Sequence, residues 1–262
     1  MQEIIITTVV IGVIGLIIGI ALVAAGKKFY VAVDEKAIAV RECLPGNNCG
    51  ACGYAGCDAV AAAIAAGEAP VNACPVCSAD AVAKIGGVMG VEAEAAQRKT
   101  AQVKCSGDCD HTSAKCNYVG IEDCRAAALA GLNTGSCTFG CLGFGSCVKA
   151  CTYDAIHVVN GVAKVDTSKC VGCGMCAKAC PKGLIEVVRA DRAFVVQCSN
   201  KDRGPAVKKV CSAGCLGCGA CVKQCEHDAI HVEGNLAYID YDKCVGCGKC
   251  AEKCPAKNIV RQ

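Results

Sequence analysis

The cysteines of this chain follow a spacing that can hold iron and sulfide. Two runs have the pattern C-x2-C-x2-C-x3-C-P, one over Cys170–Pro181 and the other over Cys244–Pro255. In this pattern three thiolates on one tight loop bind three irons of a [4Fe–4S] cube, and the fourth cysteine binds the neighbouring cube. The motifs therefore work in crossed pairs, and the chemistry that they support is the transfer of single electrons.

The number of cysteines admits two explanations, a disulfide scaffold or a metal protein. There are 28 cysteines in 262 residues, far above the usage of ordinary globular chains. They are clumped at two- and three-residue gaps, which is too close for many separate bridges and favours metal. Aromatic residues make up only 4% and Trp is absent, so metal ligation must supply folding free energy that the core lacks. The sequence therefore predicts a chain that is largely unfolded without its metal.

The C-terminal half of the chain is an internal duplication with a period of 74 residues. The shift maps nine cysteines onto nine others: Cys124, Cys137, Cys141, Cys147, Cys151, Cys170, Cys173, Cys176 and Cys180 onto Cys198, Cys211, Cys215, Cys221, Cys225, Cys244, Cys247, Cys250 and Cys254. In each copy two cysteine loops lead into a short helix and a strand. Asn160-Gly161 and Gly234-Asn235 lie between apolar runs and indicate hairpins. Each copy is therefore predicted to be a two-cluster ferredoxin-like unit.

Crossed ligation assigns three cubes of the duplicated region directly. The three ligand sets are Cys215, Cys218, Cys221 and Cys254; Cys244, Cys247, Cys250 and Cys225; and Cys170, Cys173, Cys176 and Cys151.

One cube of the first copy is short of a ligand. Phe144 stands where the second copy has Cys218, so that this cube keeps three ligands: Cys141, Cys147 and Cys180. We expect Cys137 to complete it, because this cysteine is close in sequence. Cys105 and Cys124 are the alternatives, and they could instead join Cys137 in a separate cluster.

The N-terminal half contains a separate single-cluster module. It opens on C-G-A-C-G-Y-A-G-C over Cys49–Cys57, where the glycines allow the backbone to fold tightly round a cube. Helices are expected over 58–66 and 79–100. The predicted ligands are Cys49, Cys52, Cys57 and Cys74, with Cys77 as the alternative to Cys74.

These assignments give five cubes on 20 cysteines, or six if the remaining ones form another cluster. The remaining cysteines are Cys43, Cys77, Cys105, Cys109, Cys116, Cys124, Cys198 and Cys211, and free buried thiols are the other fate open to them. A cube with four thiolates carries about −2, so five cubes would turn the formal +3 into about −7. The pI near 7.9 therefore gives no argument for a nucleic-acid partner.

The N-terminus carries an uncharged apolar run from Ile4 to Ala25. As a helix it would be about 33 Å long, enough to cross a bilayer core of about 30 Å. Met1-Gln2-Glu3 lacks the positive charge that a signal peptide needs there. Lys27 and Lys28 follow the run, and the positive-inside rule then places the C-terminal side in the cytoplasm. We expect a single-pass anchor in the cell (inner) membrane, in contact with lipid.

The expected fold class is α+β: a single N-terminal transmembrane helix, a small helical 4Fe-4S module, and two tandem two-cluster ferredoxin-like units. The expected division is an anchor over 1–28, a single-cluster domain over 29–100, a cysteine-containing connector over 101–123, and repeats over 124–197 and 198–262.

Motifs for other chemistry are missing from the sequence. No G-x-G-x-x-G follows a predicted strand and opens a helix, and no P-loop is present, so neither a nicotinamide nor an ATP site is indicated. His157 and His231 are related by the repeat and are interpreted as strand side chains beside a cluster. One-electron relay is the chemistry that remains, and no catalytic residue is assigned.

The order of the parts resembles a known family. An N-terminal apolar run, the C-G-A-C-G-Y-A-G-C module and tandem ferredoxin-like units resemble the B subunit of the Rnf complexes, the ion-translocating ferredoxin:NAD oxidoreductases of bacterial membranes. The residues over 105–151 and the two double-cluster units are similar to the long form of clostridia and related anaerobes. Cys151 and Cys225 depart from the usual motif, since Thr152 and Glu226 stand in place of the following proline.

The resemblance implies an electron-entry subunit that is not catalytic alone. Reduced ferredoxin would donate single electrons, and the flavins, the NAD site and the ion path would lie in partner subunits. The sequence leaves open whether the ion is Na⁺ or H⁺. The alternatives are a polyferredoxin that donates electrons to another redox enzyme, and a protein that stores iron or tethers a partner without redox change.

Overall fold

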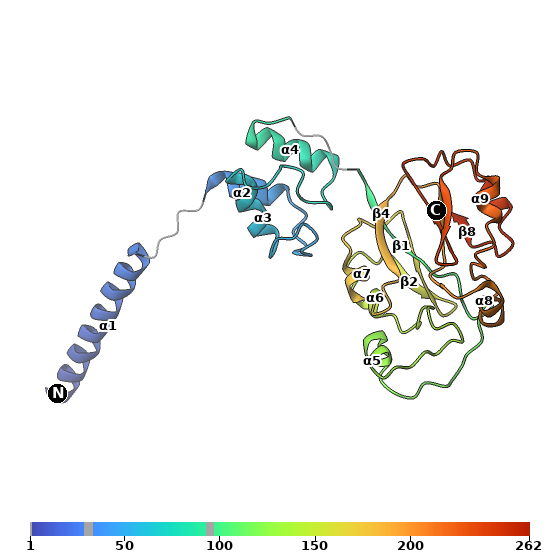
Figure 1. Cartoon of the computed structure of the whole chain (residues 1–262). Helices are drawn as coiled ribbons and strands as arrows, with labels where there is room; N and C mark the ends of the chain where they lie inside the picture. Colours follow the sequence, from blue (N-terminus) through green and yellow to red (C-terminus); the bar gives the residue numbers. More distant parts are fainter. Residues whose placement is uncertain (1, 29–33, 93–96) are drawn as a thin grey trace.

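The computed structural model describes residues 2–28, 34–92 and 97–262. In chain order these hold a long helix, a small helical module and an α+β body (Figure 1). Within the described residues the strands form two-stranded antiparallel sheets, each beside a short helix that follows a cysteine loop.

The N-terminal apolar run is helical, as part of α1 (Gln2–Lys28). A bilayer crossing needs about 20 consecutive apolar residues in a helix. Within the residues that the structure describes, no helix has the length and apolar character for a crossing. The expectation of an N-terminal transmembrane helix was therefore wrong, while the α+β class with iron–sulfur domains holds.

The helical module consists of α2 (Glu35–Cys43), α3 (Cys57–Ala65) and α4 (Ala79–Met89). Ser78 caps the start of α4 by accepting a hydrogen bond from the Ala81 amide. Gly90 ends the same helix at a φ of 70°, a left-handed conformation that glycine adopts freely. The helix predicted over 79–100 is thus shorter than expected, and its last residues belong to a strand instead. The module packs on small aliphatic side chains: Val40, Val60, Ile64 and Ile85.

The body contains two ferredoxin-like units. We define unit 1 as residues 99–103 with 141–189, and unit 2 as residues 194–196 with 215–261. Unit 1 is built from β1 (Lys99–Val103), α6 (Ser146–Lys149), β2 (Ile156–Val159), β3 (Val162–Val165), α7 (Met175–Ala179) and β4 (Ile185–Arg189). Unit 2 is built from β5 (Phe194–Val196), α9 (Ala220–Gln224), β6 (Ile230–Glu233), β7 (Leu236–Ile239), α10 (Lys249–Glu252) and β8 (Ile259–Arg261).

The central hairpins form where the turn residues predicted them. Val159 pairs with Val162 across Asn160-Gly161, and Glu233 pairs with Leu236 across Gly234-Asn235. All four turn residues have positive φ, as tight hairpin turns require. The two hairpin predictions are confirmed.

The outer strand of each unit comes from a segment that precedes its cysteine loops. β1 pairs with β4, with Lys99 opposite Arg189, and β5 pairs with β8, with Phe194 opposite Arg261. Each pair closes its unit and covers a core of small aliphatic side chains and cysteines. In each unit a further helix lies in the segment between the outer strand and the cysteine loops: α5 (Cys124–Leu129) in the first and α8 (Gly204–Val210) in the second.

Candidate iron–sulfur sites

Both cysteine sets predicted for unit 2 converge in the structure. Two cavities in the unit are lined by these sets: one by Cys215, Cys218, Cys221 and Cys254, and the other by Cys225, Cys244, Cys247 and Cys250. In each set three thiols come from one loop and the fourth from the end of the helix after the other loop. This is the crossed arrangement that the spacing predicts.

The complete set of unit 1 also comes together. Cys176 lies close enough to Cys170, Cys173 and Cys151 to interact electrostatically with all three. Backbone amides point at two of the sulfurs: Ala101 N donates to Cys170 Sγ at 3.2 Å, and Ala155 N donates to Cys151 Sγ at 3.5 Å. Such donors stabilise thiolate charge, and hydrogen bonds to sulfur are one of the factors that set a cluster's potential.

The cysteine loops need glycine where the backbone passes close to another segment. Gly172, between Cys170 and Cys173, has a φ of +69°, and a Cβ there would lie 2.7 Å from the Lys99 carbonyl oxygen. Gly217 lies between Cys215 and Cys218 in the first cysteine loop of unit 2, and a Cβ there would lie 2.7 Å from the Asn235 carbonyl oxygen. Any side chain at these positions would clash with a fixed carbonyl.

The structure brings Cys124, and not Cys137, next to the three cysteines of the fourth set. Cys147 interacts electrostatically with Cys141, Cys124 and Cys180, and these four cysteines line one cavity. Cys137 lies in a different cavity. Cys124 was one of the two alternatives that the sequence left open. It is distant in sequence from the loop that it joins, so spacing gave no preference for it.

Cys124 is held beside Cys147 by a polar contact between two helices. Asp123 caps α5 by accepting hydrogen bonds from the amides of Arg125 and Ala126, at 2.8 and 3.1 Å. Ser146 Oγ donates to Asp123 Oδ2 at 2.7 Å and accepts from the Cys124 amide at 2.8 Å. The bond from Ser146 holds the pKa of Asp123 below its usual value. The start of α5 is thereby tied to the start of α6.

Most cysteines of the N-terminal module lie at its small core, into which α3 packs. Cys57 begins this helix, and its amide donates to Asn48 Oδ1 at 2.7 Å. Cys52, Cys57, Cys74 and Cys77 all contact the module's core, as does Cys43. A hydrogen bond from Cys77 lowers the pKa of Cys74 to about 6 and raises that of Cys77. Both candidates for the fourth ligand therefore lie side by side.

The module contacts unit 1 at one of the predicted clusters. The Asn47 side-chain amide donates a hydrogen bond to the Tyr153 hydroxyl. Cys49 interacts electrostatically with Cys173, and Tyr153 is close to both. The module's cysteine site therefore lies next to the set that contains Cys173.

Another cavity is lined by Cys137, which the sequence assigned to the fourth set, and by cysteines that belong to no predicted set. Cys105, Cys137, Cys198 and Cys211 line it between the two units, and Cys141 of the fourth set lines it as well. Cys109 and Cys116 are exposed and line none of these cavities.

The repeat-related histidines contact carboxylates. His157 Nε2 lies 3.5 Å from Asp154, and His231 Nδ1 lies 3.9 Å from Asp228. Lys169 and Lys243 pair with the same two aspartates. All of these side chains are exposed, so the ion pairs contribute little to stability.

Burial shifts the titration of the clustered thiols. It raises the pKa of Cys176 and Cys221 to about 11 and that of Cys147 to about 12. These thiols are neutral near pH 7 without metal, so binding iron must release their protons.

Thiolates are soft ligands that suit iron–sulfur clusters and zinc. Within the described residues no three His, Cys, Asp or Glu side chains gather closely enough for a single metal ion. The residues present fit a cube, whose thiolates bind separate irons.

Paired, crossed cysteine sets on tandem ferredoxin-like units define an iron–sulfur protein of the polyferredoxin class. Three family models match the chain. A model described as a putative Fe-S cluster matches residues 44–76, a 4Fe-4S binding domain matches 163–186, and a 4Fe-4S dicluster domain matches 214–258.

Curated relatives cover most of the chain. The B subunit of the Na⁺-translocating ferredoxin:NAD⁺ oxidoreductase complex of Acetobacterium woodii is 44% identical over 89% of this chain and 71% of its own length. The corresponding subunit of the proton-translocating complex of Clostridium ljungdahlii is 41% identical over 92% and 85%. The B subunit of the ion-translocating oxidoreductase complex of Methanosarcina acetivorans is 38% identical over 94% of both chains. This chain belongs to the family of B subunits of the Rnf ion-translocating oxidoreductase complexes.

Proposed function

We propose that this chain accepts single electrons from reduced ferredoxin and relays them to the other subunits of an ion-translocating ferredoxin:NAD oxidoreductase complex. The observation that carries the proposal is the convergence of cysteines into crossed sets on two ferredoxin-like units. Bound [4Fe–4S] clusters would supply one-electron chemistry, and the chain would supply their ligands, burial and hydrogen bonds.

We propose five ligand sets. They are Cys49, Cys52, Cys57 and Cys74; Cys151, Cys170, Cys173 and Cys176; Cys124, Cys141, Cys147 and Cys180; Cys215, Cys218, Cys221 and Cys254; and Cys225, Cys244, Cys247 and Cys250. The first set is supported by the core that Cys52, Cys57 and Cys74 share. Relative to the sequence assignment, Cys124 takes the place of Cys137.

The contacts between parts indicate the order of the relay. Crossed ligation places the two sites of each unit side by side. The bond between Asn47 and Tyr153 holds the N-terminal module against unit 1, with Cys49 near Cys173. We infer that the module's site exchanges electrons with the set that contains Cys173, and that the module forms one end of the relay.

We propose that the complex lies at the cell membrane and that both ferredoxin-like units face the cytoplasm. Thiols remain reduced in that compartment, as cluster ligation requires. The partner subunits would hold the NAD site, the flavins and the ion path. The Na⁺ and H⁺ in the relatives' names leave the ion of this complex open.

The test is anaerobic reduction of the full chain. The purified, iron-loaded protein is mixed with reduced ferredoxin and followed by visible absorption and by EPR. After mixing, we expect the visible absorption of the clusters to fall. We also expect several EPR signals that interact with one another to appear. The exposed Cys116→Ser variant serves as the matched control and should behave like the wild type. A chain that holds iron but stays oxidised and EPR-silent, even with dithionite, would show that it is not an electron relay.

A further inference from the structure

We propose that Cys105, Cys137, Cys198 and Cys211 bind a further [4Fe–4S] cluster, which bridges units 1 and 2. The inference rests on the proposed function for the class of cofactor, and it assigns a site that lies outside all three family-model matches. None of these four cysteines belongs to the five sets above.

The four thiols line one cavity of the size found at the other sites. About 450 Å³ in this cavity is free of protein atoms, the part open to solvent included. The corresponding volume is about 400 Å³ at the Cys124 set, 320 Å³ at the Cys215 set and 380 Å³ at the Cys244 set. The bridging cavity therefore offers at least as much space as the other three.

The thiols are close to one another and receive hydrogen bonds. Cys211 interacts electrostatically with Cys137 and Cys198, and Cys105 interacts with Cys137. A Cβ on Gly107 would lie 3.2 Å from Cys211 Sγ and 3.8 Å from Cys105 Sγ, so these two sulfurs flank the same glycine.

Asn200 is the main polar group in the wall of the cavity. This residue is 2% exposed, and its side-chain amide donates to Cys137 Sγ at 3.4 Å. Its backbone amide donates to Cys198 Sγ at 3.5 Å, and the Cys215 amide donates to the same sulfur at 3.2 Å. A buried amide directed at sulfur is the kind of donor that stabilises a ligating thiolate.

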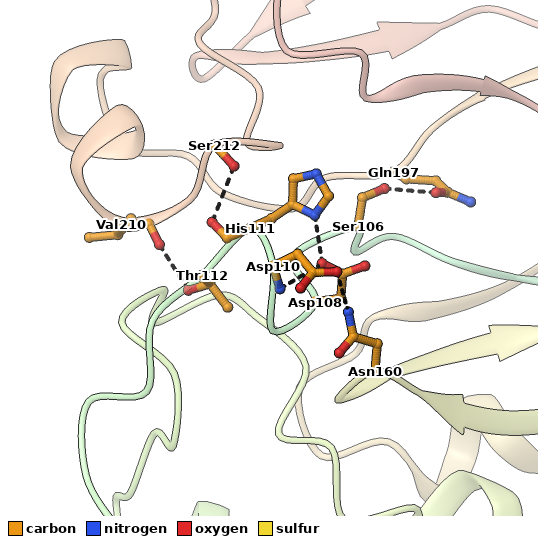
Figure 2. A network of polar contacts seen from close by, with 9 residues as sticks. All are labelled: Ser106, Asp108, Asp110, His111, Thr112, Asn160, Gln197, Val210 and Ser212. Atoms are coloured by element: carbon orange, nitrogen blue, oxygen red, sulfur yellow. Dashed lines mark hydrogen bonds and ion pairs between the residues drawn. The ribbon is translucent and has the colours of Figure 1, made fainter.

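A polar network holds the connector that carries Cys105 against the segment that carries Cys211 (Figure 2). Ser106 Oγ donates to Gln197 Oε1 at 2.7 Å, and Thr112 Oγ1 donates to the Val210 carbonyl at 2.8 Å. The Ser212 amide donates to the His111 carbonyl at 2.9 Å. These bonds join residues about a hundred positions apart and fix both walls of the cavity.

The duplication explains why the bridging cysteines are free for this role. Cys198 is the repeat equivalent of Cys124, and Cys211 is the repeat equivalent of Cys137. In unit 1, Cys124 completes a set because Phe144 supplies no thiol. In unit 2, Cys218 supplies that ligand, so Cys198 is not needed there and joins the bridging cavity instead.

The site contacts a proposed cluster site in each of the two units. Cys105 accepts a hydrogen bond from the backbone of Cys141, a ligand in unit 1, and Cys198 accepts one from Cys215, a ligand in unit 2. On binding iron the four thiols lose their protons to solvent. Cys105, Cys137, Cys198 and Cys211 would hold a cluster able to take one electron from a reduced cluster of one unit, which would thereby be oxidised, and to pass it to the other unit.

A single zinc ion is the competing occupant, because thiolates bind it well. The distances between the thiols in the structure argue against zinc. Within the described residues no three ligand side chains gather for one ion, and this holds for the bridging cavity as it does for the sets that match 4Fe-4S family models.

The test is elemental analysis of the anaerobically purified, reconstituted full chain, with the Cys137→Ser/Cys211→Ser double variant and a Cys109→Ser/Cys116→Ser control. We expect about 24 irons and as many sulfides per wild-type or control chain, and about 20 in the double variant, because each cube holds four. EPR of the dithionite-reduced samples should lose one spin in the double variant only.

The outcomes separate this inference from the proposed function. About 20 irons in the wild type and the double variant alike, with the clusters still reducible, would overturn the bridging site and leave the relay standing. One zinc per chain would overturn it as well. A chain without iron would overturn both proposals. If the double variant does not fold, the wild-type iron content decides alone.

Discussion

At the scale of single residues, one position distinguishes the two ferredoxin-like units. Phe144 occupies the place of Cys218, and its ring packs against Tyr118 with centroids 4.9 Å apart. Cys124, from another segment, lines the cavity beside the three remaining cysteines of this set. If it is the fourth ligand, as we propose, its equivalent in the second copy, Cys198, is available for the bridging site.

We predict that Phe144→Cys restores the cube that Cys124→Ala removes. Cys124→Ala should lower the iron content by about four per chain, because one corner of the cube loses its ligand. The added thiol takes the position that Cys218 has in unit 2, so the double variant should regain these irons. Iron and sulfide analysis under anaerobic conditions measures both changes.

Cys137→Ala provides the contrast for this prediction. It should also cost about four irons, but from the bridging cavity, where Phe144→Cys offers no replacement. If Phe144→Cys instead restored the irons lost in Cys137→Ala, and not those lost in Cys124→Ala, the two assignments would be reversed. Cys137 would then belong to the set that the sequence suggested.

At the scale of elements, short helices position ligands through their ends. α5 has only six residues, which is too short to be stable alone, so its start must be fixed by contacts. Asp123 and Ser146 provide them, and together they set Cys124 beside Cys147. The hydroxyl of Ser146 is buried in this contact, so its loss would leave the Cys124 amide without its partner.

We predict that Asp123→Ala lowers the Tm of the loaded chain by a few degrees and speeds the loss of iron from one cube to a chelator. Asp123→Asn keeps an acceptor oxygen and should lie close to the wild type. The pKa of Asp123 is below its ordinary 3.8, so its contribution is present above that value and is lost as the pH falls through the lowered pKa.

The pH dependence provides the check on this mechanism. The difference in Tm between wild type and Asp123→Ala should stay constant from about pH 5 to about pH 8, because Asp123 remains ionised throughout. A difference that changes within this range would mean that another group, and not the carboxylate, ties α5 to α6.

At the scale of the whole molecule, the hydrophobic core contains few large side chains. Within the described residues the largest fully buried side chains are Ile, Val and Asn, and no aromatic ring is among them. The cysteines themselves belong to the cores of the module and of both units. Metal ligation must therefore contribute a large share of the folding free energy.

We predict that anaerobic removal of the clusters, by a chelator with a mild oxidant, unfolds units 1 and 2. The circular dichroism of the short helices and strands should fall toward that of a coil, and limited proteolysis should cut throughout the body. Reconstitution with iron and sulfide should reverse both changes. An apo chain that keeps a cooperative thermal transition at the same Tm would show that the aliphatic core suffices.

The sequence by itself showed the duplication and predicted the iron–sulfur chemistry and most of the cysteines that the structure brings together. This was possible because a cube's ligands on one loop must have a fixed spacing, and the hairpin between them needs turn residues with positive φ. The fold class followed for the same reason, apart from the transmembrane helix. The end of α4 at Gly90 and the strand at Lys99–Val103 were missed, since no local pattern told that strand from a continued helix.

Only the tertiary structure placed Cys124 rather than Cys137 beside the fourth set, brought Cys49 beside Cys173, and gathered Cys105, Cys137, Cys198 and Cys211 around one cavity. These sets join cysteines that are far apart in the chain, so their spacing carries no information about their distance in space. That distance depends on how β1 and β5 pair with distant strands and on how the connector lies between the two units. Such long-range packing is a property of the folded chain as a whole, which is why local sequence could not reveal it.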